Sequence, residues 1–438
     1  MERMELELET IVPGGEAIAH HQGMAIFVPF GAPGDLVEVE VISTKPQYAR
    51  ALIKRIIKEG PDRVAPRCPF FGRCGGCQLQ HLSYPAQLES KRGIVIDSLE
   101  RLSKLESFDR EKVNPVLPGD PWYYRNKVHW AIEGKAIGLY EARSHKVVEA
   151  PHCFIQHPLN NLVLDFLRKE IKNFGFPRDW LKSAFAKVGH HTDELMIGLV
   201  SSADAFSRQA EWSADIRDRF PEIRSIVQNV NKNPGNTLMG KKNLILWGKE
   251  AIHEKIGDLT FSVSPLSFFQ VNSLQVEALY DEVARMAELS GKERVVDAYA
   301  GTGTIALFLA GRASEVVGIE SVPEATRDAA SNARSNGIKN VRFLTGLVEE
   351  RLGALTREFK PHVVVLDPPR KGCEAAAIQA IGEARPRRVV YVSCNPATLA
   401  RDLSRLAEVG YRLDEVTPVD MFPQTAHVEC VARLSLKE

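Results

Sequence analysis

Hydrophobic and polar residues alternate along the first 60 residues of the chain. Four stretches show the alternation, at 4–12, 24–30, 36–43 and 49–59, and glycine and proline residues interrupt it between them. Side chains of a strand point alternately to its two faces, so this period of two predicts half-buried strands. Short strands at such spacing predict a small β-barrel over residues 1–60.

The pattern changes after residue 60. Residues 85–108 repeat apolar positions at helical spacing and carry many charges, which predicts one amphipathic helix. We place this helix in a central α/β domain, residues 61–260, and expect it to pack against the C-terminal domain.

From residue 261 onward, short apolar runs alternate with helical segments. Strands are expected near 294–298, 315–319, 340–344, 362–366, 388–393, 411–416 and 427–434. Strands alternating with helices predict a doubly wound, Rossmann-like sheet over residues 261–438. The expected fold class is therefore multidomain α/β, with a small N-terminal barrel, a central α/β domain and a C-terminal Rossmann-like sheet.

Composition limits the function classes. The 438 residues are 44% hydrophobic and 26% charged, which is ordinary for a globular protein of two or three domains. No run of about 18 apolar residues predicts a membrane span, and the acidic N-terminus does not resemble a targeting peptide, so we expect a cytoplasmic protein. The net charge of +0 argues against a protein that simply coats nucleic acid, although residues 41–75 are locally basic.

Three cysteines lie close together in a C-x5-C-x2-C pattern: Cys68, Cys74 and Cys77. Gly75 and Gly76 allow the backbone to turn tightly between them. Three thiolates need a fourth ligand to close a tetrahedral zinc site or an iron–sulfur cubane, and Cys153 is the natural candidate. We expect a [4Fe–4S] cluster, with zinc as the alternative, because spacing alone does not separate the two.

Several polar residues are expected at the carboxyl ends of strands in the last domain. Asp297 and Gly301 follow the first strand, Glu320 ends the second, Asp367 ends the fourth and Cys394 ends the fifth. In open α/β sheets, ligands bind outside the carboxyl ends of the strands. The glycine loop and Glu320 predict a nucleotide with ribose hydroxyls, and a dinucleotide remains open at this point.

Cys394 is the candidate nucleophile. It follows a buried strand and precedes Asn395-Pro396, where a helix is expected to begin. The positive end of a helix dipole favours a thiolate over a thiol. The competing interpretation is a buried structural cysteine, the commoner fate of a lone cysteine.

A cluster of aromatic and basic residues lies near residue 125, within the central domain. Tyr124, Arg125 and Lys127 combine a ring that can stack on a base with charges that can hold phosphates, which predicts an RNA contact. The alternative, which we weight equally, is a strand with one solvent-exposed face and no RNA contact.

Residues 14–41 resemble a TRAM domain, a small OB-like RNA-binding barrel. Residues 261–438 resemble the RNA (uracil-5)-methyltransferase family through five motifs: FFQVN (268–272), DAYAGTGT (297–304), LDPPRKG (366–372), SCNPATLARD (393–402) and HVECVARL (427–434). With the cysteine triplet, the resemblance is nearest to the bacterial 23S rRNA methyltransferases that carry an iron–sulfur cluster.

The resemblance implies an activity and a set of site residues. It implies S-adenosylmethionine-dependent methylation of RNA, with rRNA favoured over tRNA, by an enzyme that we expect to be a monomer. Cys394 would be the nucleophile and Glu429 the general base. Residues of the predicted cofactor site are Gln270, Asp297, Tyr299, Gly301, Thr304, Glu320 and Asp367. The cluster ligands implied are Cys68, Cys74, Cys77 and Cys153.

The chemistry explains these residue types. C5 of uracil is a poor nucleophile until a thiolate adds to C6 and forms an enolate. C5 then attacks the sulfonium methyl group, a base removes the C5 proton, and the thiol is eliminated. The target base must leave its stack to reach Cys394.

Two other function classes remain open on the sequence alone. A nucleotide-dependent oxidoreductase with an iron–sulfur centre would keep its activity after Cys394→Ala. A non-catalytic RNA-binding assembly factor would bind RNA but form no covalent adduct with 5-fluorouridine RNA.

Overall fold

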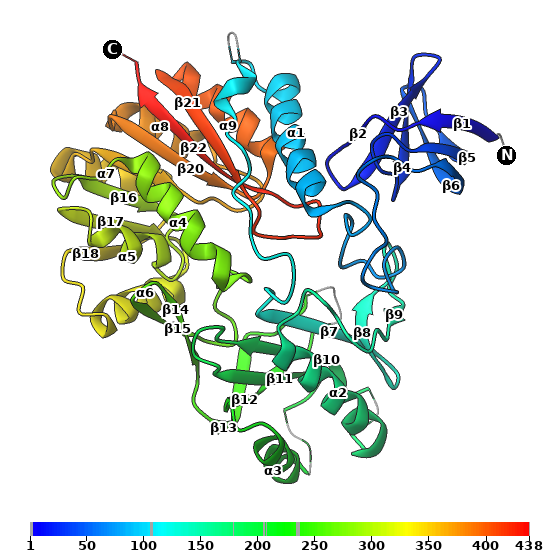
Figure 1. The fold of residues 1–438 in the computed structure, drawn as a ribbon. Helices are drawn as coiled ribbons and strands as arrows, with labels where there is room; N and C mark the ends of the chain where they lie inside the picture. Colours follow the sequence, from blue (N-terminus) through cyan, green and yellow to red (C-terminus); the bar gives the residue numbers. More distant parts are fainter. Residues whose placement is uncertain are drawn as a thin grey trace. The chain divides into compact units, whose positions relative to one another are not determined.

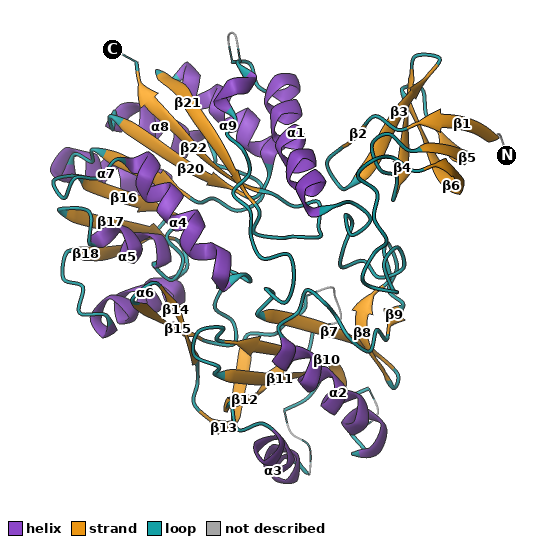
Figure 2. Cartoon of the chain, viewed as in Figure 1, coloured by secondary structure: helices purple, strands orange, loops and turns teal. Residues whose placement is uncertain are grey.

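The fold was analysed in a computed structural model that describes residues 3–105, 108–177, 179–204, 206, 208–233 and 237–437. Figure 1 follows the chain from end to end, and Figure 2 distinguishes its helices and strands. The chain divides into two compact units. The first comprises Met1–Gly72, Gly76–Pro121 and Val365–Glu438, and the second comprises Arg73–Gly75 and Trp122–Val364. These units divide the chain differently from the three domains expected from sequence.

The N-terminal strands form one curled six-stranded sheet in the order β1-β5-β6-β4-β3-β2. Its strands are β1 (Arg3–Glu7), β2 (Thr10–Ile11), β3 (Glu16–His21), β4 (Met24–Pro29), β5 (Leu36–Thr44) and β6 (Tyr48–Lys58). Alternate side chains such as Val37 and Val39 are fully buried, as the period of two predicts. The core of this sheet also includes Leu79, Leu82 and Ile94 from beyond the barrel.

Helix α1 (Tyr84–Leu102) follows the sheet in the same unit. Pro85 stands in its first turn, where a missing backbone donor costs nothing. The helix ends six residues before the expected position, because Ser103 adopts an extended conformation and donates its N–H to the Leu99 carbonyl. α1 packs against α9 (Pro396–Glu408) and β21 (Tyr411–Val419). The short helix η1 (Arg110–Lys112) comes next.

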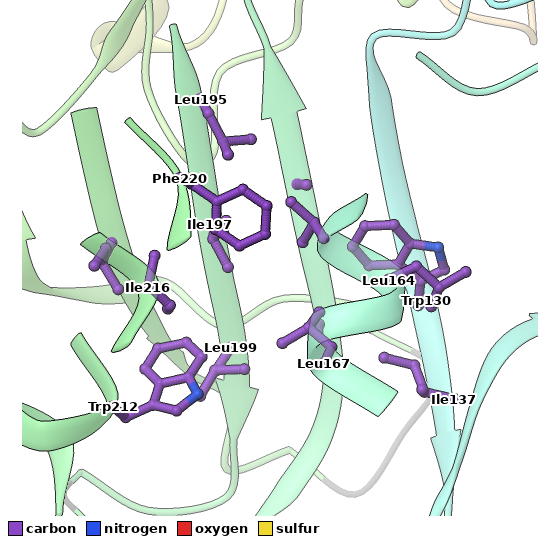
Figure 3. Packing of buried hydrophobic residues seen from close by; sticks show 14 of the residues in the cluster. Trp130, Ile137, Leu164, Leu167, Leu195, Ile197, Leu199, Trp212, Ile216 and Phe220 are labelled. Atoms are coloured by element: carbon purple, nitrogen blue, oxygen red, sulfur yellow. The ribbon is translucent and has the colours of Figure 1, made fainter. Parts of the chain in front are cut away.

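The second unit contains a seven-stranded sheet in the order β13-β12-β11-β10-β7-β8-β9. Its strands are β7 (Lys127–Glu133), β8 (Ala136–Tyr140), β9 (Val147–Val148), β10 (Leu181–Val188), β11 (Leu195–Ser201), β12 (Ile223–Val230) and β13 (Lys242–Gly248). Helices α2 (Pro158–Asn173) and α3 (Gln209–Arg219) cover it with apolar side chains. Figure 3 shows Leu164 and Leu167 of α2 and Trp212 and Ile216 of α3 among the strand residues. The hairpin β14 (Ile252–Ile256) and β15 (Leu259–Val263) follows.

The third sheet has the order β18-β17-β16-β19-β20-β22-β21. Its strands are β16 (Arg294–Ala298), β17 (Glu315–Glu320), β18 (Val341–Thr345), β19 (Val363–Leu366), β20 (Arg388–Ser393), β21 and β22 (Glu429–Leu436). The helices are α4 (Ser273–Ala287), α5 (Thr304–Ala310), α6 (Pro323–Ser335), α7 (Val348–Phe359), α8 (Ala375–Ala384) and α9. The predicted Rossmann-like sheet and the multidomain α/β class are confirmed. Among the described helices, none combines the length and the apolar character needed to cross a membrane.

Candidate active site

The turn after β20 places Cys394 at the start of a helix. β20 ends at Ser393, Asn395 is the N-cap of α9, and Pro396 is the first helical residue. The Asn395 side chain accepts a hydrogen bond from the Ala397 N–H at 3.1 Å, which satisfies one donor of the first turn. Cys394 is half-buried at this turn, in the position expected from sequence.

A second turn, Asp367 to Arg370, lies against the first. The Arg370 carbonyl accepts hydrogen bonds from the Asn395 side-chain amide and the Thr398 hydroxyl, each at 3.3 Å. The Arg370 guanidinium lies 3.3 Å from Nδ1 of His427. The two turns are therefore tied together within the first unit.

Strand register brings Glu429 to the same place. β22 runs antiparallel to β20, with Ser393 opposite Cys430. Cys394 and Glu429, the first residue of β22, are the next residues along the two strands, and the Glu429 carboxylate interacts electrostatically with the Cys394 thiol. Glu429 is only 5% exposed and lies opposite Val419 of β21 on its other side.

The pKa values of three side chains are raised at this site, those of Cys394, Asp367 and Glu429. Burial, together with the nearby Glu429 carboxylate, raises the pKa of the Cys394 thiol to about 11, although Arg370 acts in the opposite direction. Burial raises the pKa of Asp367 to about 7. Burial and the Asp367 charge raise the pKa of Glu429 to about 8, again opposed by Arg370.

These shifts correct one expectation. The helix N-terminus was expected to favour a thiolate at Cys394, whereas burial and the Glu429 carboxylate raise the pKa of this thiol. The raised pKa of Glu429, in contrast, favours its use as a base. A carboxylate whose pKa is close to neutrality is a stronger base than an ordinary surface glutamate.

A pocket of about 220 Å³ opens beside Cys394. Its walls come from distant parts of the first unit: the barrel turn, helix α1, the Arg370 turn, the start of α9 and the segment before β22. The lining residues are Pro13, Gly14, Ile94, Ser98, Arg370, Cys394, Asn395, Pro396, Ala397, Ala426, His427 and Val428.

The glycine loop lies in the second unit, after β16. Tyr299, Gly301 and Gly303 all have left-handed φ values, of 67°, 55° and 83°. A Cβ on Gly303 would lie 2.7 Å from the ring of Phe343, so only glycine fits there. This backbone is suited to close approach by a nucleotide.

Glu320 ends β17 beside this loop. Its carboxylate accepts hydrogen bonds from the Gly301 N–H at 2.9 Å and from the Val322 N–H at 2.8 Å. The side chain is half-buried. A carboxylate held in this way can accept ribose hydroxyls at its remaining lone pairs, and the loop and Glu320 together fit the nucleoside of S-adenosylmethionine.

Two predicted cofactor residues also have contacts within the protein. Asp297 is fully buried, and its carboxylate accepts a hydrogen bond from the Ala306 N–H at 2.9 Å, which holds the first turn of α5. The Thr304 hydroxyl lies 2.8 Å from the hydroxyl of Tyr280 on α4. Asp297 and Thr304 thus connect the glycine loop to helices α5 and α4.

Gln270 is held by residues of the predicted RNA cluster. The Asn126 side-chain amide donates to the Gln270 carbonyl at 3.1 Å, and the Asn126 N–H donates to the Val271 carbonyl at 2.8 Å. Tyr124 is fully buried, so its ring is not available to stack on a base, which corrects that part of the prediction. Arg125 and Lys127 are half-buried.

Sequence reasoning missed a second support of this segment. Lys187 is 3% exposed and donates to the carbonyls of Ser264 at 2.6 Å and Ser267 at 3.1 Å. Burial lowers the pKa of this lysine well below its ordinary value. A lysine inside the apolar run at residues 184–188 is the signal that could have found it.

The four cysteines of the predicted cluster are divided between the units. Cys68 and Cys77 belong to the first unit, Cys74 and Cys153 to the second, and all four are half-buried. In the part of the chain that the structure describes, no three His, Cys, Asp or Glu side chains are grouped so as to hold a metal ion. The iron–sulfur cluster therefore stays a prediction from the sequence.

Comparisons with known proteins identify the family. A family model described as tRNA (Uracil-5-)-methyltransferase matches residues 239–437, and a TRAM domain model matches residues 2–54. An uncharacterized RNA methyltransferase of Halalkalibacterium halodurans is 41% identical, over 99% of this chain and 97% of its own. One of Caldanaerobacter subterraneus is 40% identical, over 98% and 97%.

A solved structure agrees. The tRNA (uracil-54, C5)-methyltransferase of Pyrococcus abyssi, in complex with S-adenosyl-L-homocysteine, has a TM-score of 0.78 and 29% identity, over 98% of this chain and 99% of its own.

The chain belongs to the RNA (uracil-5-)-methyltransferase family. It is an S-adenosylmethionine-dependent enzyme that methylates C5 of uracil in RNA. The candidate site residues of this methyltransferase are Cys394 and Glu429 in the first unit and the glycine loop with Glu320 in the second.

Proposed function

We propose that this methyltransferase modifies a uridine of 23S rRNA, with Cys394 as the nucleophile and Glu429 as the general base. The observation that supports this assignment is that the thiol of Cys394 and the buried carboxylate of Glu429 lie close enough to interact electrostatically, directly beyond the paired residues Ser393 and Cys430. Arg370 and Asp367 complete the same end of the sheet.

The proposed reaction proceeds by addition to C6, methyl transfer to C5, removal of the C5 proton and elimination of the thiol. The Cys394 thiolate forms a bond to C6, and the electrons of the C5–C6 double bond move to O4 as an enolate. S-adenosylmethionine supplies a methyl cation equivalent to C5 and leaves as S-adenosylhomocysteine. Glu429 then takes the C5 proton, the double bond reforms, and the bond between C6 and sulfur breaks.

Arg370 has a role at the first step. The thiol must lose its proton before it attacks, and its raised pKa of about 11 opposes this loss. The Arg370 guanidinium lowers that pKa, because it favours the anion. In the proposed sequence Arg370 stabilises the thiolate that attacks C6.

The cofactor is proposed to lie across the residues at the other strand ends. Glu320 would accept the ribose hydroxyls, and Gln270, Tyr299 and Asp367 would surround the methionine part and the methyl group. The backbone of Gly301 gives the loop its close approach. Asp297 and Thr304 support this loop through Ala306 and Tyr280.

The choice of rRNA rests on the cysteine triplet, and one observation favours tRNA. The Pyrococcus abyssi structure that matches almost the whole chain is a tRNA enzyme. A tRNA uridine is therefore the second candidate substrate. We further propose that Cys68, Cys74, Cys77 and Cys153 hold a [4Fe–4S] cluster, and that the enzyme is a cytoplasmic monomer.

One experiment tests the activity and the substrate together. RNA carrying [5-³H]uridine releases tritium only when C5 is substituted. We expect release from 23S rRNA that depends on S-adenosylmethionine, and none from a mature tRNA pool. Release from tRNA alone would reverse the substrate assignment, and release from neither would contradict the activity.

The cluster has its own test. Protein purified without oxygen should be brown and contain about four irons per chain if four thiolates hold a cubane. Stoichiometric zinc in place of iron would contradict the cluster.

A further inference from the structure

The segment that precedes Glu429 is unusually long for its position. Residues 420–428 connect β21 to β22, which are neighbouring antiparallel strands. Hairpin loops commonly have two to five residues, so this loop of nine residues needs support from elsewhere. It supplies Ala426, His427 and Val428 to the pocket beside Cys394.

A buried ion pair anchors the start of this segment. Nζ of Lys91 on helix α1 lies 2.5 Å from Oδ1 of Asp420, and both side chains have no exposed surface. The same ammonium group donates to the Phe422 carbonyl at 3.0 Å. The Tyr84 hydroxyl donates to Oδ2 of Asp420 at 3.0 Å, also from α1.

A paired amide contact anchors the middle. Gln87 of α1 is 1% exposed, and its Nε2 donates to Oε1 of Gln424 at 3.0 Å. In return, the Gln424 N–H donates to Oε1 of Gln87 at 3.0 Å. Gln424 has a φ of 70°, a left-handed conformation that non-glycine residues rarely adopt. The contacts with Gln87 help to hold Gln424 in this rarely populated backbone conformation.

These contacts come from one face of α1. Tyr84, Gln87 and Lys91 are spaced three and four residues apart, so they lie along one face of the helix. The same spacing continues to Ile94 and Ser98, which line the pocket beside Cys394. One helix face thus holds the 420–428 segment and forms a wall of the pocket.

A purely stabilising role explains this arrangement poorly. Burying a lysine and an aspartate costs desolvation energy that their attraction often fails to recover, and apolar residues of similar size are frequently as stable. The ion pair does fix geometry, because each partner has a charge that must be satisfied in one place. That geometry is the path of the backbone leading to Glu429.

We infer that Tyr84, Gln87 and Lys91 are positioning residues: through the 420–428 segment they hold the Glu429 carboxylate where it can remove the C5 proton. This inference rests on the proposed function, since it assigns proton removal to Glu429. It predicts that proton removal after methyl transfer is slowed more than formation of the bond between Cys394 and C6. Formation of the bond between Cys394 and C6 depends on a different turn, which β20 and α9 hold.

The test variant is Gln87→Leu, which removes both amide contacts without stranding a charge. With ordinary uridine RNA and S-adenosylmethionine, the methylated adduct is released only when the C5 proton is removed. A displaced carboxylate should therefore lower kcat by roughly 10- to 100-fold, with KM for RNA little changed. An adduct that resists denaturation by sodium dodecyl sulfate should accumulate.

Arg92→Leu is the matched control. Arg92 also lies on α1, and it donates to the Val113 carbonyl at 3.1 and 2.9 Å, away from the 420–428 segment. It should lose some stability but accumulate no adduct. If Gln87→Leu does not fold, the double variant Lys91→Met/Asp420→Leu, which removes both charges together, should show the same accumulation.

The outcomes separate the two proposals. Equal adduct levels in Gln87→Leu and Arg92→Leu, or in the double variant and Arg92→Leu, would overturn the positioning role. If wild-type enzyme forms no adduct even with 5-fluorouridine RNA, the proposed mechanism fails instead.

Discussion

Two glutamates at strand ends of the third sheet have different surroundings. Glu320 is half-buried and accepts hydrogen bonds from two backbone N–H groups, which leaves further lone pairs of its carboxylate for other donors. Glu429 is almost fully buried beside Asp367, and its pKa is raised to about 8. The same side chain is thus suited to binding hydroxyls in one place and to transferring a proton in the other. Environment, and not residue type, separates the two roles.

The largest effect that sharpens this comparison is expected from Glu429→Gln. Loss of a general base lowers turnover by about 10²- to 10⁴-fold. Because addition and methyl transfer precede proton removal, a covalent adduct with ordinary uridine RNA should build up while binding of S-adenosylmethionine is unchanged. Gel electrophoresis of the adduct and isothermal titration check the two parts.

The exposed Glu383→Gln on α8 is the control for this variant. It should behave as wild type. Normal turnover in Glu429→Gln would remove Glu429 from the mechanism.

The pH dependence of turnover follows from the same residue. Glu429 acts as a base only when it is ionised, so with a pKa of about 8 its active fraction rises about tenfold per pH unit below that value. We expect kcat to rise steeply from pH 6 to pH 8 and less steeply above pH 8, where Glu429 is fully ionised and the Cys394 thiol, with a pKa of about 11, still loses its proton. Single-turnover rates at several pH values measure this, and a flat profile would contradict the assignment.

Stability should change in the opposite direction. The pKa of Glu429 is higher in the folded protein than its ordinary value of 4.5, so folding favours the neutral acid. This contribution is complete below about pH 4.5 and is lost as the pH rises through about 8. Glu429→Gln should therefore raise the melting temperature relative to wild type at pH 9 but not at pH 5.

A smaller effect is expected from Glu320→Gln. Loss of a charged acceptor for ribose hydroxyls costs roughly 1.5–3 kcal/mol of binding, or about 10- to 100-fold in Kd for S-adenosylmethionine. At saturating cofactor, kcat should stay near the wild-type value, in contrast to Glu429→Gln. The exposed Glu324→Gln serves as the control. An unchanged Kd would mean that Glu320 does not contact the cofactor.

The smallest effect concerns the backbone of the glycine loop. Gly303→Ala should cost about 1–2 kcal/mol for the left-handed φ of 83°, plus the displacement of Phe343. Gly301→Ala carries only the conformational cost, because nothing lies within 4 Å of its added Cβ. Chemical denaturation should rank Gly303→Ala below Gly301→Ala in stability, and the reverse order would contradict the packing at Phe343.

Much of the third sheet could be predicted from sequence. Its strands were expected within a few residues of their observed bounds, because buried apolar runs and the turns after them are strong local signals. The position of Cys394 before Asn395 and Pro396 followed from the same reasoning.

The remaining features depend on contacts between distant parts of the chain. The cluster around Tyr124 has the composition of an RNA-binding surface, yet it supports Gln270 from the interior. Helix α1 was expected to pack against the C-terminal domain, but the sequence did not indicate that Lys91 pairs with Asp420, more than 300 residues later. The raised pKa of Cys394 also depends on burial, which sequence does not reveal.

The central claim is that Cys394 and Glu429 act as a nucleophile and base on a uracil ring. 5-Fluorouridine RNA tests it most directly, because fluorine at C5 leaves no proton for the base to remove and the adduct persists. Wild-type enzyme and Cys373→Ala, which changes a buried cysteine outside the pocket lining, should both form the adduct, and Cys394→Ala should not. An adduct with Cys394→Ala, or none with wild type on rRNA and tRNA, would contradict the claim.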